Sequence, residues 1–152
     1  DCLLSRGLGD VYKRQHKLGA AFHVPHGLAN AMILIETIKF NAVDDPTKQG
    51  TFPQYKYPEA KARYAAMADM LKLGGKTDDE KLEKLIEAIE ALKKRLDIPS
   101  SLQELGVPED AFLAGVEELS EKAFDDQCTG ANPRYPLISQ IKEMYLRVYY
   151  GK

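Results

Sequence analysis

The sequence has little of what several classes of protein require. It has only two cysteines, Cys2 and Cys128, and this number excludes a disulfide-rich scaffold and a cysteine-only zinc site. Its longest apolar run, residues 31–35, is far shorter than the ~18 residues of a membrane-spanning helix. The formal net charge is only -2, so the chain has no overall attraction to nucleic acid or acidic membranes. We expect one globular domain in a reducing, cytoplasmic setting, with neither nucleic acid nor membrane as partner.

Residues 1–15, which read DCLLSRGLGDVYKRQ, differ from the remainder of the chain. They begin without methionine, and their apolar residues follow neither the helix nor the strand period. Arg6 interrupts the apolar residues too early for a secretory signal, and a lone Gly-Leu-Gly does not make a phosphate-binding loop. The ending VYKRQ resembles read-through translation of a sequencing adapter. We therefore expect residues 1–15 to be non-native and residues 16–152 to form the domain; a genuine N-terminal segment is the alternative.

Apolar spacing beyond residue 16 predicts helices and no strand. Residues 27–41 are apolar around most of the helix circumference, which predicts a helix deep in the core. Thr77 and Glu80 form a capping box ahead of an apolar stripe, and Gly74 with Gly75 should end the preceding helix. The prediction is an all-α fold of about six helices: 27–41, one beginning near Pro58, one from the Thr77 cap to residue 96, a short turn at 101–105, 108–126 and 137–150.

All three histidines of the chain, His16, His23 and His26, lie within eleven residues. His23 and His26 have the spacing of a helical ligand pair, but Pro25 pushes Val24 out of the helical conformation. His26 then lies at a constrained corner before a helix, where an imidazole can be held in one orientation for a metal. A catalytic metal site needs about three protein ligands, so one histidine does not make one. From spacing alone, a packed side chain is the favoured explanation of all three histidines, most strongly for His23; for His26 this would be a partly buried side chain bonded to a backbone carbonyl.

A second polar stretch, FDDQCTGANPRYP at 124–136, separates two apolar helices. Its small residues Gly130 and Ala131 allow close approach by another backbone or by a ligand. Cys128 is a candidate pocket thiol, although no histidine lies near it in sequence to activate it. The alternative interpretation is a hydrogen-bonded connector in which Arg134 caps a helix end.

The segments HKLGAAFHVPHGLANAMIL and AFDDQCTGANPRYPLI together closely resemble the C-terminal part of the iron-containing alcohol dehydrogenases. The resemblance is strongest to the alcohol dehydrogenase half of the bifunctional aldehyde–alcohol dehydrogenases, and it covers residues 16–152. It implies a C-terminal helical domain that supplies the metal site, in agreement with the all-α prediction. It also implies an N-terminal α/β domain, absent from this chain, that binds most of the NAD(H).

The resemblance further implies roles for individual residues. Members of the family bind one Fe2+ through an aspartate and three histidines, and His26 matches the last of these ligands. The other ligands lie upstream in the family, one of them a histidine four residues before His16. His16 itself matches a catalytic histidine that lies near the nicotinamide and relays the proton, whereas His23 matches no ligand. The loop that contains Cys128 looks like the segment that approaches the substrate pocket.

The implied reaction is metal-assisted hydride transfer between NAD(H) and a small aldehyde or alcohol, namely acetaldehyde or ethanol. The full-length relatives are expected to form homo-oligomers or filaments. With one ligand of four, the isolated chain should neither hold iron tightly nor turn over alcohol, and it should expose apolar surface that the other domain would bury. A non-enzymatic helical interaction module explains the amphipathic helices equally well. A metal-sequestering domain that uses all three histidines is disfavoured by Pro25.

Overall fold

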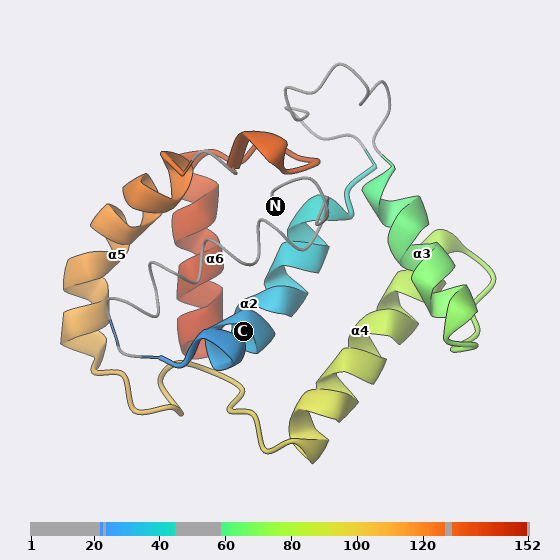
Figure 1. The fold of residues 1–152 in the computed structure, drawn as a ribbon, viewed down its shortest axis with the longest axis horizontal. Helices are drawn as coiled ribbons and strands as arrows, with labels where there is room; N and C mark the ends of the chain where they lie inside the picture. The colour runs from blue at the N-terminus through green and yellow to red at the C-terminus, as the bar shows by residue number, and fades with distance from the viewer. Residues whose placement is uncertain (1–21, 23, 45–58, 127–128, 152) are drawn as a thin grey trace.

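The computed structural model describes residues 22, 24–44, 59–126 and 129–151 of the 152-residue chain. These residues form five α-helices and one short 3-10 helix, and they contain no strand (Figure 1). The helices are α2 (His26–Asn41), α3 (Ala60–Met70), α4 (Asp78–Arg95), α5 (Glu109–Phe124) and α6 (Ile138–Tyr150), with η1 (Thr129–Ala131) between the last two. The all-α prediction is therefore confirmed, and Pro58, the expected start of the second helix, lies outside the described residues.

The main core lies between α2, α5 and α6, which stand side by side in Figure 1. α2 is buried along most of its length, as its apolar circumference predicted. Phe112 of α5 stacks on Tyr149 of α6 with ring centroids 4.3 Å apart, and both side chains are essentially inaccessible to water. Burial of each such aromatic side chain contributes about 2–3 kcal/mol. The segment between α4 and α5 closes one end of this core with Leu102 and Val107.

Helices α3 and α4 form a hairpin on the other side of α2 (Figure 1). The Thr77 hydroxyl accepts a hydrogen bond from the Glu80 amide at 3.2 Å, as the capping box predicted. The Glu80 carboxylate, however, accepts from the Lys76 amide rather than from that of Thr77. The prediction that Gly74 and Gly75 end α3 was wrong by a few residues. α3 already ends at Met70, because Lys72 adopts a left-handed conformation with φ 56°.

The short turn expected at 101–105 is present as a turn and not as a helix. The Ser101 hydroxyl accepts from the Glu104 amide at 3.0 Å, and the Glu104 carboxylate accepts from the Ser100 amide at 2.7 Å. The Ser100 hydroxyl also donates to this carboxylate, and the two bonds to Ser100 lower the pKa of Glu104. The turn thereby holds the chain between the hairpin and the core.

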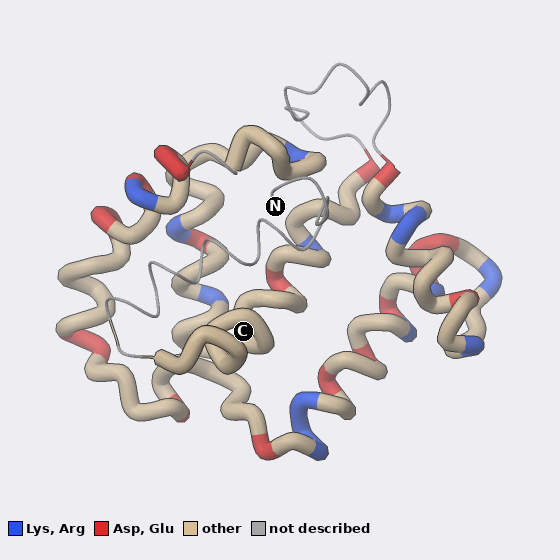
Figure 2. Tube along the Cα trace, viewed as in Figure 1, with Lys and Arg blue, Asp and Glu red and all other residues tan. Residues whose placement is uncertain are grey.

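The hairpin leaves apolar side chains exposed. The predicted stripe on α4 is fully buried only at Leu85, because α4 packs mainly against α3 and only slightly against α2. Charged residues of both signs occur on the helices, with acidic residues predominating on α5 and basic residues filling the last turn of α4 (Figure 2). Within the described ranges, no helix combines the length and apolarity needed to cross a bilayer. The exposed large apolar residues of the hairpin are Met67, Met70, Leu71, Leu92 and Leu96.

Candidate functional site

The Pro-His-Gly corner lies at the N-terminal end of α2. Pro25 is extended, with φ -53° and ψ 138°, and the helix begins at His26. The Pro25 carbonyl accepts from the Ala29 amide at 3.0 Å, which fixes the first turn. His26 is half-buried, and a Cβ placed on Gly27 would meet no atom within 4 Å. The structure thus places His26 on a constrained corner, and His26 is the first residue of the helix rather than the residue before it.

The electrostatics of this corner limit what it binds. The first turn of α2 contains no acidic residue, and its N-cap residue, Pro25, makes no side-chain capping hydrogen bond. The positive end of the helix dipole is therefore not offset locally. A cation beside His26 needs an anionic ligand from another part of the protein, because the helix itself disfavours positive charge at this end.

The other predicted site residues, His16, His23 and Cys128, lie outside the described residues. Of the sequence-predicted metal and catalytic residues, the structure therefore places only His26. Among the residues that are described, no group of three or more histidine, cysteine, aspartate or glutamate side chains is arranged to hold a metal ion.

Residues 129–136 of the second polar stretch pack against the C-terminal end of α2. The Arg134 guanidinium donates to the Phe40 carbonyl oxygen at 2.9 Å and lies 4.1 Å from the centroid of the Phe40 ring. Partial burial lowers the pKa of Arg134. At the start of the stretch, the Thr129 hydroxyl donates to the Ala123 carbonyl at the end of α5. The connector interpretation, with Arg134 capping a helix end, is the one that the structure supports.

The Pro-His-Gly corner and the second polar stretch therefore lie at opposite ends of α2. α2 has 16 residues, which corresponds to a length of roughly 24 Å. His26 lies at its first residue and the Arg134 contact at its last turn. Within the part of the chain that is described, the structure does not bring these segments together.

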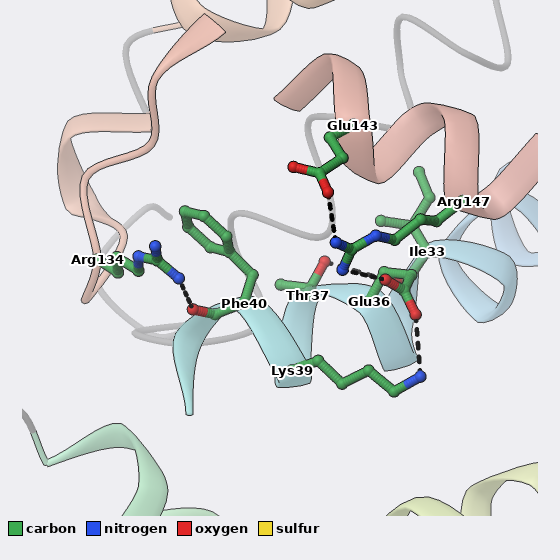
Figure 3. A network of polar contacts seen from close by, with 8 residues as sticks. All are labelled: Ile33, Glu36, Thr37, Lys39, Phe40, Arg134, Glu143 and Arg147. Carbon is green, nitrogen blue, oxygen red and sulfur yellow. Dashed lines mark hydrogen bonds and ion pairs between the residues drawn. The ribbon is translucent and has the colours of Figure 1, made fainter. Parts of the chain in front are cut away.

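A polar network that sequence reasoning missed joins the middle of α2 to α6 (Figure 3). Glu36 is only 8% exposed, and its carboxylate pairs with Lys39 at 3.1 Å and with Arg147 of α6 at 3.7 Å. Arg147 also pairs with Glu143. The signal was available, since Glu36 is the one acidic residue in the helix predicted to lie deepest in the core, and a buried carboxylate requires a cationic partner.

Comparison with known proteins places the chain in a family. The model of the "Fe-containing alcohol dehydrogenase family, C-terminal" matches residues 3–149. The bifunctional aldehyde-alcohol dehydrogenase AdhE of Escherichia coli K12 is 54% identical over 147 residues. An aldehyde-alcohol dehydrogenase of Clostridium acetobutylicum is 52% identical over 142 residues. The solved iron-containing alcohol dehydrogenase of Thermococcus thioreducens superimposes with a TM-score of 0.72 at 34% identity.

These matches cover nearly all of this chain but only a part of each relative. The two aldehyde-alcohol dehydrogenases match 95% and 93% of this chain, which spans 16% of each of them. The Thermococcus structure matches 94% of this chain, which spans 32% of that protein. The family model begins at residue 3, inside the segment 1–15 that the sequence analysis set apart. The domain boundary at residue 16 stays a prediction.

Proposed function

This chain belongs to the iron-containing alcohol dehydrogenase family, and on that premise we propose that it is the C-terminal helical part of an NAD-dependent alcohol dehydrogenase. The complete enzyme would interconvert a small aldehyde and its primary alcohol, with acetaldehyde and ethanol as the expected pair. The observation that supports this most directly is the 54% identity to a bifunctional aldehyde-alcohol dehydrogenase across 95% of the chain.

His26 is the proposed contribution of this chain to the Fe2+ site of the complete enzyme. Its half-buried position at the start of α2, directly after the extended Pro25, suits an imidazole ligand. The uncapped N-terminus of α2 calls for an anionic partner ligand, which the aspartate of the family would supply. The described residues do not by themselves form a metal site, so the chain supplies one ligand to a site whose other ligands come from elsewhere.

When bound, the nicotinamide would supply a hydride to the carbonyl carbon of the aldehyde, and a proton would have to reach the carbonyl oxygen. In this proposal His16 relays that proton. NAD(H) binds mainly to the other domain of the enzyme. We further propose that the complete enzyme is cytoplasmic and forms homo-oligomers or filaments, and that the isolated chain is inactive.

A chimeric enzyme tests the proposal. In it, residues 16–152 replace the corresponding part of the Escherichia coli enzyme, and iron content and NAD-dependent ethanol oxidation are measured. His26→Ala should lose the iron and the activity, because one of the few metal ligands is removed. His23→Ala is the matched control, and it should retain both. An iron-loaded His26→Ala enzyme would contradict the proposed role.

A further inference from the structure

A cavity of about 590 Å³ lies between α2, the C-terminal half of α4 and α6. It is bordered by the network of Figure 3, since Glu36, Lys39 and Arg147 all contribute to its wall. From α4 it is lined by Lys93 and Lys94, which belong to the basic last turn at the lower end of that helix in Figure 2. The cavity is open to solvent and large enough for a small organic molecule.

Lys93 differs from the other described lysines in its surroundings. Six of them form ion pairs with carboxylates, whereas Lys93 forms none within the described ranges, although it is half-buried. Lys72, Lys76 and Lys94 also have no such pair, but these three are exposed. The six paired lysines are Lys39, Lys61, Lys81, Lys84, Lys122 and Lys142.

The carboxylates that face the cavity are in part occupied by other groups. Glu36 of α2 is bound by Lys39 and Arg147, and Glu104 is bound by Ser100. The other acidic residues of the lining are Glu90, which lies on α4 as Lys93 does, and Asp97, which follows that helix. Lys93 therefore shares the cavity with several charges of both signs but is held by none of them.

These surroundings make the Lys93 ammonium easier to deprotonate than that of an exposed lysine. Burial lowers the pKa of Lys93, and the charge of Lys39 lowers it further, while Glu90 and Glu36 oppose the shift. By contrast, hydrogen bonds that their ammonium groups donate to carboxylates raise the pKa of Lys61, Lys81 and Lys84. A lysine that is partly desolvated beside another cation is the recognised setting of a nucleophilic amine.

We infer that Lys93 is a modification site at which this chain forms imines with small aldehydes that enter the cavity. The neutral Nζ attacks the carbonyl carbon and forms a C–N bond, while the carbonyl π electrons move to oxygen. A proton passes from nitrogen to that oxygen, and the carbinolamine then loses water to give the imine. The inference rests on the proposed function only for the source of the aldehyde, which is the substrate or product of that reaction.

Reductive alkylation of the 152-residue chain tests the site. The chain is treated with acetaldehyde and cyanoborohydride, which delivers hydride to the imine carbon and fixes the adduct as a secondary amine. Peptide mass spectrometry then measures the rate of alkylation at each lysine. Lys93 should react several-fold faster than Lys94, its exposed neighbour on the same cavity, and than the carboxylate-paired Lys84. The preference should vanish in concentrated urea.

A variant of the chain distinguishes a low pKa of Lys93 from a mere difference in the solvent accessibility of the lysines. Glu90→Gln removes the carboxylate that most opposes the low pKa of Lys93, so it should raise the rate at Lys93 and leave that at Lys84 unchanged. Equal rates at Lys93 and Lys94, or no response to Glu90→Gln, would overturn the inference. Labelling needs neither iron nor NAD(H), so its failure is distinguishable from the failure of the proposed function.

Discussion

The side-chain amide of Asn132 donates to the side-chain carbonyl oxygen of Asn41 at 2.9 Å, across 91 positions of sequence. Asn132 is 1% exposed and Asn41 is 3% exposed. The same Asn132 amide also donates to the Arg134 carbonyl, and the Arg134 guanidinium in turn binds the Phe40 carbonyl. The segment after η1 is thereby fixed to the end of α2 by buried polar contacts as well as by packing.

Asn132→Ala should destabilise the fold by about 1–3 kcal/mol, because it leaves the buried oxygen of Asn41 without its donor. Urea unfolding followed by circular dichroism measures the change. The double variant with Asn41→Ala should cost less than the sum of the two single variants, since the residues share one interaction. Gln103→Ala, at an exposed position, is the control and should change stability by no more than about 0.5 kcal/mol. Strict additivity would show that the contact contributes nothing.

The helices could be predicted from sequence because apolar spacing reports which face of each helix is buried. Residues 27–41 are apolar around most of the helix, and α2 begins and ends within one residue of that prediction. The weaker pattern on α3 gave the wrong end, since the left-handed Lys72 has no signature in the composition of the helix. Arg134 as a helix cap was foreseen as an alternative from its place in a polar connector, and the structure shows which end it caps.

The pairing between helices could not be predicted in the same way. Glu36 and Arg147 lie on helices far apart in sequence, and their contact depends on how α2 and α6 pack. Periodicity describes one helix at a time and contains no information on its neighbours. The same holds for Lys93, whose half-buried position depends on the gap between α4 and α2.

Glu36→Gln should destabilise the fold by about 1–2 kcal/mol. The amide keeps the shape of the side chain but leaves Lys39 and Arg147 as neighbouring like charges without their shared carboxylate. The expected destabilisation is modest because Lys39 and Arg147 are both about half exposed and their charges are screened by water. Thermal unfolding measures it, and added salt should reduce the difference from the parent chain.

The matched control for Glu36→Gln is Glu118→Gln. Glu118 pairs with Lys122 on the surface of α5, and loss of such a pair should cost no more than about 0.5 kcal/mol. Equal effects of the two substitutions would show that burial of Glu36 adds nothing to the strength of its pairing.

Tyr64→Phe should reduce the sensitivity of the fold to alkaline pH. Burial raises the pKa of Tyr64, with the Asn41 side chain opposing in part, so the folded state keeps the phenol proton to a higher pH than the unfolded chain does. The contribution to stability is complete below the unfolded value of about 10 and is lost as the pH rises through the folded pKa. Urea midpoints at about pH 8 and about pH 11 measure this, and an unchanged alkaline loss in the phenylalanine variant would contradict it.

The metal site is the part of the function that depends most on residues outside the described structure. The family resemblance implies a histidine ligand four residues before His16, and this chain has Tyr12 at that position. A phenol is not the imidazole that the family uses there. His26 is the remaining candidate ligand that the structure places, and it stands at a helix end that disfavours a cation.

The isolated 152-residue chain should therefore retain far less than one iron per molecule. The chain is incubated with Fe2+ under anaerobic conditions, passed through gel filtration and analysed for iron, because a weakly held ion separates from the protein on the column. The chimera described above should retain its iron, since it adds the ligands that this chain does not supply. Stoichiometric iron on the isolated chain, or ethanol oxidation by it with NAD, would show that its own residues complete a site, and His23 together with His16 would then be the first ligands to replace.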